Sequence, residues 1–341
     1  MPSSRRIFLQ TSAALALTAW DVTALAQTSR PAQEGSTQDY QARDLDWLDS
    51  VRQRAVPVRL YLPKSNAADS PGKVQASWPL VIFSHGIGGS RHGYKWFGQH
   101  MARHGIASLH LQHVGSDLNL WRGNPLGLVG RLQDAAKESE ALARVQDLRF
   151  ALDTLLASNL GPSFDPQRIV AAGHSYGANT TLLAAGARVQ RASGLMDFAD
   201  ERIRGAIVIS APPFYGESDL APILEPIKVP SLHITATEDV IRIPGYFSGA
   251  DDRLKVFDAT GSEHKWLAVY SGGSHSMFTD RTRTGGAELN PLVKQATQSL
   301  ALAFLRAVWD DDHQALAAWP LQHAALLARY SAPPVLHATR G

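Results

Sequence analysis

The chain of 341 residues contains no cysteine, which excludes disulfide bonds, zinc–thiolate sites and a cysteine nucleophile. It also lacks an excess of one charge. The 33 Lys and Arg nearly balance 31 Asp and Glu, the formal net charge is +2, and there is no basic block. Nucleic acid is therefore not an expected partner. Apolar residues make up 44% of the chain and charged residues 19%, a composition typical of a globular protein with a full core.

Long hydrophobic runs are missing too, apart from one apolar segment near the start that is too short to span a bilayer and stop there. Just before it, residues 4–9 (SRRIFL) match the S-R-R-x-F-L pattern of the twin-arginine export signal. The letters ALA at 24–26 supply a small-x-small cleavage site. Residues 1–26 are therefore predicted to be a signal peptide, with Gln27 as the first mature residue. An uncleaved anchor is the alternative, which Trp20-Asp21 disfavours because this pair interrupts the apolar stretch.

Export by this route predicts a protein that folds in a bacterial cytoplasm and acts in the periplasm or outside the cell. No stable membrane span is expected once the signal is removed. Residues 27–42 are polar and aperiodic, which predicts a flexible leader, and residues 43–341 are predicted to form the catalytic domain. The domain is expected to begin with a β-hairpin arm at 49–63 and a loop rich in Ser, Ala, Pro and Gly.

Short apolar strands alternate with helical segments through this domain, with no internal repeat and no sign of a second domain. Such alternation predicts an α/β fold, with a mostly parallel central sheet and helices on both of its faces. The expected strands lie at 79–86, 106–113, 168–173, 205–210, 230–239 and 264–273, and the expected helices at 93–105, 135–158 and 290–309.

Near the middle of the chain, the segment GHSYG places Ser175 between two glycines. An apolar strand precedes it and a helical segment follows, which is the setting of the G-x-S-x-G turn that presents a nucleophilic serine. Glycines at 173 and 177 permit the sharp turn because they bring no side chain against the strand or the helix. The pattern and its position together predict that Ser175 is a nucleophile.

A serine hydroxyl is a weak nucleophile and needs a base that an acid orients. In the strand–turn–helix type of site, the chain order is nucleophile, acid, base, and the acid and base follow later strands. Asp239 lies at the end of the strand expected at 230–239, and His275 lies in a Gly-Ser loop after the next strand. Asp239 is the favoured acid and His275 the favoured base; the neighbouring Glu238 is the alternative acid.

Such a serine also needs two backbone N–H groups that stabilise the developing oxyanion. One is expected from Tyr176, the residue after the nucleophile. The other is expected from the glycine-rich loop FSHGIGGSR at 83–91 and is assigned to Ile87. This loop carries neither the P-loop ending nor the dinucleotide-binding spacing, so a phosphate-binding interpretation is disfavoured.

These segments resemble serine hydrolases of the α/β-hydrolase fold over about residues 43–310. FSHGIGGSR and GHSYG are similar to the platelet-activating-factor acetylhydrolase and dienelactone-hydrolase-like group. TATED and GGSHS resemble bacterial polyester hydrolases and cutinase-like esterases. The acetylhydrolases carry their acid on the strand after the nucleophile helix, where this chain offers Ser210 and no carboxylate, so the acid is expected one strand later. Dienelactone hydrolases use a cysteine nucleophile, which this chain lacks.

Two apolar segments are candidates for substrate contact because each follows the end of an expected strand, where ligands bind in open α/β sheets. The segment 116–130 contains Trp121 and several leucines, which form either a lip over the pocket or ordinary packing. Phe214 and Tyr215 follow another strand and are candidates for contact with an acyl or alcohol group.

Three other histidines are interpreted as structural. His110 and His113 lie on one expected strand at a spacing that puts them on opposite faces, which disfavours a metal pair. His174 is expected to pack beside the serine turn. The predicted reaction is therefore hydrolysis of a small-molecule or polymeric carboxylic ester through an acyl-enzyme, without metal or organic cofactor. An amidase, peptidase or lactonase with the same three residues is the alternative, followed by a non-catalytic binding protein on this fold.

The export prediction is tested by changing both arginines of the signal to lysine. Arg5→Lys with Arg6→Lys should abolish export, because recognition of this signal depends on the arginine pair. The measurement is the distribution of the chain between cytoplasm and periplasm, with N-terminal sequencing of the exported form, which should begin near Gln27. Unchanged export of the double variant would rule out the twin-arginine interpretation.

Overall fold

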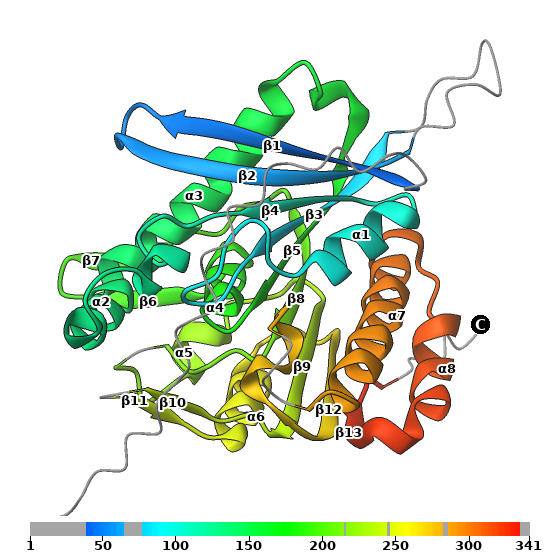
Figure 1. The fold of residues 1–341 in the computed structure, drawn as a ribbon. Coiled ribbons are helices and arrows are strands. Elements are labelled where there is room, and N and C mark those ends of the chain that lie inside the picture. Colours follow the sequence, from blue (N-terminus) through cyan, green and yellow to red (C-terminus); the bar gives the residue numbers. More distant parts are fainter. Residues whose placement is uncertain (1–38, 65–76, 215, 244–245, 282–285, 335–341) are drawn as a thin grey trace, which may run out of the picture. The chain divides into compact units, whose positions relative to one another are not determined.

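A nine-stranded sheet forms the centre of the structure, a computed structural model that describes residues 39–64, 77–214, 216–243, 246–281 and 286–334 (Figure 1). The predicted signal peptide and the leader up to residue 38 lie outside the described residues. Strand order is β1-β2-β4-β3-β5-β8-β9-β12-β13. The pairs from β4 through β12 are parallel, and the edge pairs β1–β2, β2–β4 and β12–β13 are antiparallel.

The strands of this sheet are β1 (Tyr40–Asp49), β2 (Arg54–Pro63), β3 (Trp78–Ser84), β4 (Ala107–Leu111), β5 (Phe164–His174), β8 (Ile203–Ile209), β9 (Ser231–Glu238), β12 (Lys265–Ser274) and β13 (Leu327–Ser331). Two small hairpins, β6 (Arg188–Arg191) with β7 (Gly194–Asp197) and β10 (Ile241–Ile243) with β11 (Tyr246–Ser248), stand apart from it. The helices are α1 (Lys95–Arg103), α2 (Leu128–Ala135), α3 (Glu138–Ala157), α4 (Tyr176–Ala184), α5 (Ala221–Leu224), α6 (Ala250–Ala259), α7 (Leu289–Asp310) and α8 (Gln314–Gln322).

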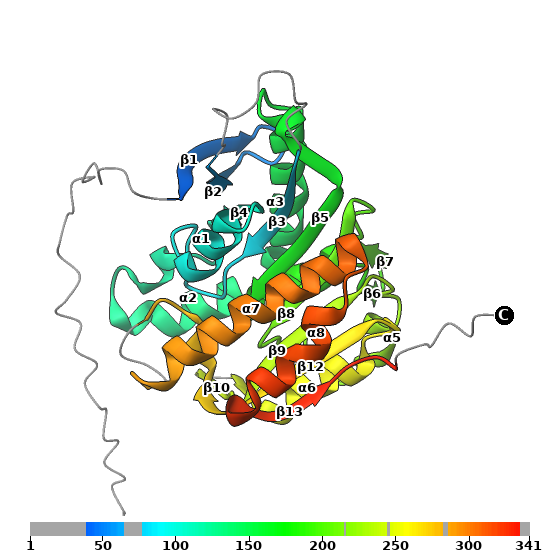
Figure 2. The same ribbon diagram turned by 90° about the vertical axis from the view of Figure 1, so that its right-hand side faces the viewer.

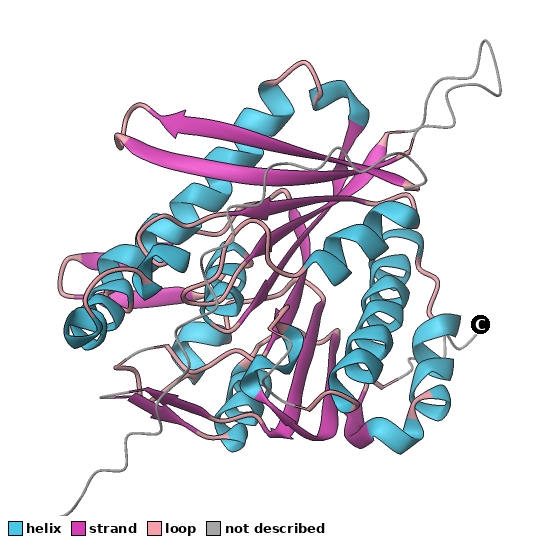
Figure 3. Ribbon diagram, in the orientation of Figure 1, coloured by secondary structure: helices cyan, strands magenta, loops and turns pink. Residues whose placement is uncertain are grey.

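Each central strand is buried on both faces because helices cover the sheet on both sides (Figure 3). Side chains alternate along a strand. In β3, Leu80 and Ile82 belong to the core beneath α3, α4 and α5, whereas Val81 and Phe83 belong to the core beneath α1, α7 and α8. Figure 2, turned toward the second face, shows α7 and α8 in front of the strands. The predicted α/β fold with a mostly parallel sheet is confirmed.

The hairpin at the start of the domain differs from the prediction. Its first strand, β1, begins at Tyr40, so the last residues of the predicted leader belong to the sheet, and β1 pairs along its whole length with β2. The apolar residues of β1 are sparse and separated by Asp and Arg, because this edge strand is only partly buried. That composition is why its sequence looks like a leader. The two small hairpins and the antiparallel strand β13 were not predicted from the sequence.

None of the helices in the described ranges is both long enough and apolar enough to cross a membrane.

Candidate active site

The predicted site residues lie at the ends of neighbouring parallel strands. The glycine-rich loop at 83–91, called the oxyanion loop below after its predicted role, follows β3. Ser175 follows β5, Asp239 follows β9 and His275 follows β12. Since these strands are parallel, their carboxyl ends meet at one edge of the sheet, where open α/β sheets bind ligands. The fold thereby brings together residues that are far apart in the sequence.

The turn at Ser175 is as sharp as its sequence predicts. Ser175 has φ 56° and ψ −122°, a backbone conformation that costs a non-glycine residue about 1–3 kcal/mol. Its N–H donates to the carbonyl of Ile209 on β8, at 2.9 Å, which holds the turn in place. Both flanking glycines are required by space. A Cβ on Gly177 would lie 1.9 Å from the carbonyl oxygen of Ser84, and one on Gly173 2.2 Å from that of Gly177.

Ser175, His275 and Asp239 form a continuous hydrogen-bonded row. The Ser175 Oγ lies 2.7 Å from Nε2 of His275, and Nδ1 of the same ring lies 2.7 Å from Oδ1 of Asp239. Ser175 is 6% exposed and Asp239 is fully buried, so the row reaches solvent at the serine and imidazole only. This geometry is suited to removing a proton from the serine hydroxyl while the carboxylate fixes the ring.

Asp239 is held as an ionised carboxylate. Burial by itself would raise the pKa of Asp239, but the charge and hydrogen bond of His275, together with the charge of Arg253, hold it well below its usual range. The hydroxyl of Thr235 also donates to Oδ2, at 2.7 Å. Glu238, the alternative acid, is exposed at the end of β9 and makes no hydrogen bond to His275 among the described residues.

The oxyanion loop presents the N–H of Ile87 because the other end of the same peptide is fixed. The carbonyl of Gly86 accepts from Nδ1 of His85, at 2.6 Å, and from the N–H of Gly89, at 3.0 Å. In a planar trans peptide the C=O and N–H groups point in opposite directions, so the Ile87 N–H faces away from these donors. Among the described residues no protein acceptor takes this N–H.

The ring of His85 can donate to that carbonyl in one tautomer only. Its Nε2 accepts from the backbone N–H of His113, at 3.1 Å, so the proton of the neutral ring lies on Nδ1. Burial lowers the pKa of His85 well below its ordinary value, which keeps the ring neutral. His85 lies in the loop motif, but its role could not be predicted from the sequence because its partner follows β4 and is distant along the chain.

The second predicted donor, Tyr176, is the first residue of α4, where backbone N–H groups have no acceptor within the helix. The two donors flank the serine. A Cβ built on Gly86 would lie 3.2 Å from the Cβ of Ser175, so the peptide that carries the Ile87 N–H passes directly beside the nucleophile. The partial positive charge at the start of α4 adds to the favourable field for an anion there.

The chain is similar to known proteins in sequence and in fold. Residues 48–117 match the family model of platelet-activating factor acetylhydrolase, isoform II. The chain is 26% identical over 251 residues to the platelet-activating factor acetylhydrolase of Cavia porcellus; the match covers 64% of this chain and only about half, 52%, of that relative.

Two solved structures match over most of their length. One is a cold-adapted esterase from an Arctic intertidal metagenomic library, with a TM-score of 0.51 at 20% identity, covering 78% of this chain and 98% of that one. The other is a ferulic acid esterase from Streptomyces cinnamoneus, with a TM-score of 0.55 at 20% identity, covering 81% and 91%. The chain has the α/β-hydrolase fold.

Within this fold, His174 joins the serine turn to both the oxyanion loop and the predicted base. Its Nε2 donates to the carbonyl of His275, at 3.0 Å, and its Nδ1 therefore accepts from the hydroxyl of Tyr94, at 2.8 Å. The Tyr94 oxygen in turn accepts the N–H of Gly86, at 3.2 Å. Burial and the nearby His275 lower the pKa of His174 well below its ordinary value. The ring therefore stays neutral, and the hydrogen bonds from Gly86 to the carbonyl of His275 keep one direction.

The residues proposed to contact substrate differ in their positions. Trp121, 43% exposed, packs over the oxyanion loop: its indole N–H donates to the carbonyl of Gly88, at 2.9 Å. Leu120 is buried in a cluster with residues of α2, which is ordinary packing, whereas a lip formed by Trp121 over a substrate pocket stays a prediction. Phe214 is half-buried against the core beneath α3 and α4, and its contact with substrate stays a prediction. Tyr215 lies outside the described residues.

His110 and His113 are both buried and bind protein groups. His110 hydrogen-bonds Ser108 and the carbonyl of Gly93, whereas His113 hydrogen-bonds Ser84 and Asp147. Within the described ranges, no cluster of three His, Asp or Glu side chains has the arrangement of a metal site.

The two candidate acids can be separated by a matched pair of amide substitutions. Asp239→Asn should slow labelling of Ser175 by a fluorophosphonate roughly 10³-fold or more, because the amide stabilises the wrong imidazole tautomer and no longer stabilises the imidazolium. Glu238→Gln should label within about twofold of wild type, since an exposed side chain without a hydrogen bond to the ring contributes little. The measurement is the second-order labelling rate. If Glu238→Gln is the slower variant, Glu238 is the acid.

Proposed function

We propose that this protein is a serine hydrolase that cleaves carboxylic esters through an acyl-enzyme intermediate. The observation that carries the proposal is the 2.7 Å contact between Ser175 Oγ and His275 Nε2, with Asp239 on the opposite ring nitrogen. A nucleophile, an oriented base and two unoccupied backbone donors are the parts that acyl transfer requires.

In the proposed first step, His275 takes the proton of the Ser175 hydroxyl as its oxygen attacks the ester carbonyl. The carbonyl oxygen becomes an anion and accepts from the N–H groups of Ile87 and Tyr176. When the tetrahedral intermediate collapses, the proton on His275 passes to the leaving alcohol and the acyl group stays on Ser175. Water then attacks the acyl-enzyme, His275 removes its proton, and a second collapse releases the acid and restores the serine hydroxyl. Ionised Asp239 stabilises the imidazolium in both halves.

An ester is proposed rather than an amide because the matched relatives carry the names acetylhydrolase and esterase. The proposed partner is a small-molecule or polymeric ester, and the proposed place of action is outside the cytoplasmic membrane, on the strength of the export signal. An amidase or lactonase would use the same groups. A panel of ester, amide and lactone substrates with one shared acyl group distinguishes these possibilities by their specificity constants.

The role of the serine is tested by Ser175→Ala. Removing the nucleophile should lower hydrolysis of p-nitrophenyl acetate to the level of the uncatalysed reaction plus any residual contribution of the oxyanion hole, a loss on the order of 10⁶ in kcat. The circular dichroism spectrum should be unchanged, since alanine removes one oxygen only. Turnover close to wild type in the folded variant would remove Ser175 from the mechanism.

The apolar residues beside the site predict a dependence on acyl length. Each methylene buried in a pocket contributes about 0.8 kcal/mol, so kcat/KM should rise about fourfold per carbon from acetyl until the pocket is filled, and then level off or fall. If Trp121 borders the acyl pocket, Trp121→Ala should shift the maximum toward longer chains, whereas exposed Leu195→Ala on the distant β7 should leave it unchanged. A flat profile from acetyl to decanoyl would show that no shaped acyl pocket exists.

A further inference from the structure

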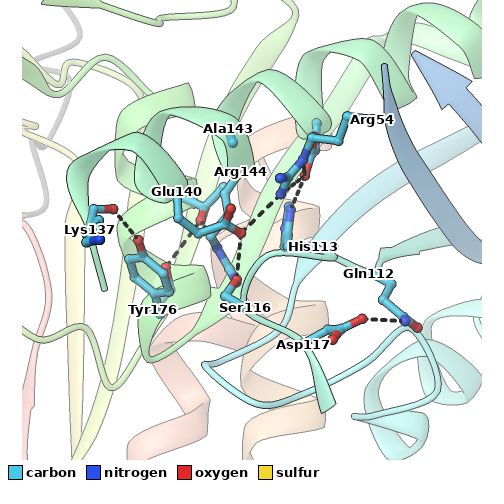
Figure 4. Close-up of polar contacts among 12 residues, drawn as sticks. Arg54, Gln112, His113, Ser116, Asp117, Lys137, Glu140, Ala143, Arg144 and Tyr176 are labelled. Carbon is cyan, nitrogen blue, oxygen red and sulfur yellow. Dashed lines mark hydrogen bonds and ion pairs between the residues drawn. The ribbon is translucent and has the colours of Figure 1, made fainter. Parts of the chain in front are cut away.

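A buried arginine lies between the two proposed oxyanion donors. Arg144 is on α3, and its side chain is fully buried beneath the start of α4 (Figure 4). Its guanidinium carbon lies 4.5 Å from the centre of the Tyr176 ring, which places the charge under the residue that follows the nucleophile.

All three guanidinium nitrogens of Arg144 donate hydrogen bonds, each to a different segment. Nε donates to the hydroxyl of Thr180 on α4, at 3.0 Å, and one terminal nitrogen donates to the hydroxyl of Ser116, at 2.7 Å. The other terminal nitrogen donates to the carbonyl of His85. The planar fork therefore fixes three elements at once, which a single-point donor such as lysine does not do.

Two of these contacts fix the oxyanion loop. The carbonyl of His85 belongs to the peptide immediately before the Gly86–Ile87 peptide, so Arg144 holds the loop one peptide away from the proposed donor. The carbonyl of Ser116 also accepts from the N–H of Gly88, at 2.8 Å, on the other side of Ile87. The loop is thus held on both sides of Ile87: by Arg144 itself at His85, and by Ser116, which Arg144 binds, at Gly88.

The remaining hydrogen bond and the ring contact hold the start of α4. Thr180 lies one turn after Tyr176, and its hydroxyl is within 3.2 Å of the Tyr176 carbonyl. With the ring contact, this gives Arg144 two attachments to the segment that supplies the second donor. One side chain consequently sets the spacing between the two halves of the oxyanion hole.

The carboxylates near Arg144 form their direct contacts with other residues. The nearby carboxylates bind other groups: Asp147 pairs with Arg54 and His113, and Glu140 pairs with Arg54 and the Ser116 hydroxyl. In the described part of the chain, Arg144 itself donates to neutral oxygens and forms no ion pair. Burial lowers its pKa to about 10, so it is still a cation at neutral pH. The charges of Glu140 and Asp147 act on Arg144 from nearby, but its direct hydrogen bonds go to the oxyanion loop, to Ser116 and to α4.

We propose that Arg144 is the positioning residue of the oxyanion hole: it fixes the Ile87 and Tyr176 N–H groups at the spacing that the tetrahedral intermediate requires. This inference rests on the proposed ester hydrolysis. Arg144 touches no reacting atom, and it acts through the loop and the helix that carry the two donors.

The test compares Arg144→Met with Arg54→Met. Both substitutions remove an arginine from the same polar network; Arg144 is fully buried and Arg54 is partly buried. Among the described residues, Arg54 pairs with Glu140 and Asp147 and forms no hydrogen bond to the oxyanion loop or to α4. Turnover of an aryl ester and of its thionoester is measured for each variant and normalised to the sites labelled by a fluorophosphonate after complete reaction. Expressing turnover per labelled site corrects for any loss of folded protein. Sulfur is a weak hydrogen-bond acceptor, so the thionoester reports on the chemistry with little help from the oxyanion hole.

For Arg144→Met, kcat on the oxoester should fall on the order of 10²-fold with KM nearly unchanged, because displaced donors lose stabilisation of the transition state only. The thionoester should lose less than about fivefold. Arg54→Met should lower the melting temperature while kcat per labelled site stays within about threefold of wild type on both substrates. Arg144→Lys keeps the charge but not the fork, so its loss on the oxoester should lie between wild type and Arg144→Met.

Three results would overturn the proposal. Equal losses on the two substrates, or a wild-type kcat per labelled site in Arg144→Met, would show that Arg144 stabilises the fold only. If Arg144→Met yields no folded protein, Arg144→Lys and Thr180→Val provide the same comparison, and equal losses on the two esters there count against the proposal in the same way. A wild-type protein that neither labels nor hydrolyses any ester would instead overturn the proposed function, and this inference with it.

Discussion

The close approach of the serine turn to the end of β3 is the constraint on which the rest of the site depends. With no side chain at position 177, the first turn of α4 lies against the carbonyl groups of Ser84 and His85. That contact brings the start of a helix and the loop after β3 to the same point. The strained backbone of Ser175 is one result, and the closeness of the Gly86 backbone to the Ser175 side chain is another. Any side chain at Gly177 would separate the two halves of the site.

Much of the fold and the order of the site residues could be predicted because both depend on local patterns that repeat along the chain. Short apolar strands such as 79–86 and 168–173 are bounded by glycine and by helical periodicity, so each could be recognised by itself. Once the strands are taken as parallel, their carboxyl ends must share an edge, and Ser175, Asp239 and His275 follow three of those ends. Chain order alone was therefore sufficient to bring the three together.

The supporting residues could not be found in this way, because their importance comes from partners that are distant in sequence. Arg144 and Asp147 share the buried face of α3 with Leu148, and helical periodicity would assign that face to apolar packing. A charged residue at the helical spacing of the buried leucines indicates a buried polar contact. It does not indicate which group accepts the hydrogen bond. The same holds for His85, whose tautomer is set by a backbone N–H at His113. The edge strand β1 was missed for the opposite reason, since its few apolar residues give too weak a pattern.

The hydrogen bonds of His174 limit how the serine turn could be transferred into another protein. In the G-x-S-x-G pattern the second position is written as any residue, yet here its ring connects the carbonyl of His275 to the hydroxyl of Tyr94. Transplanting the five residues alone would leave that ring with two unmatched nitrogens in a dry interior. A functional transfer of the serine turn must include Tyr94 and the loop at Gly86. What has to be transferred is therefore a set of contacts and not a stretch of sequence.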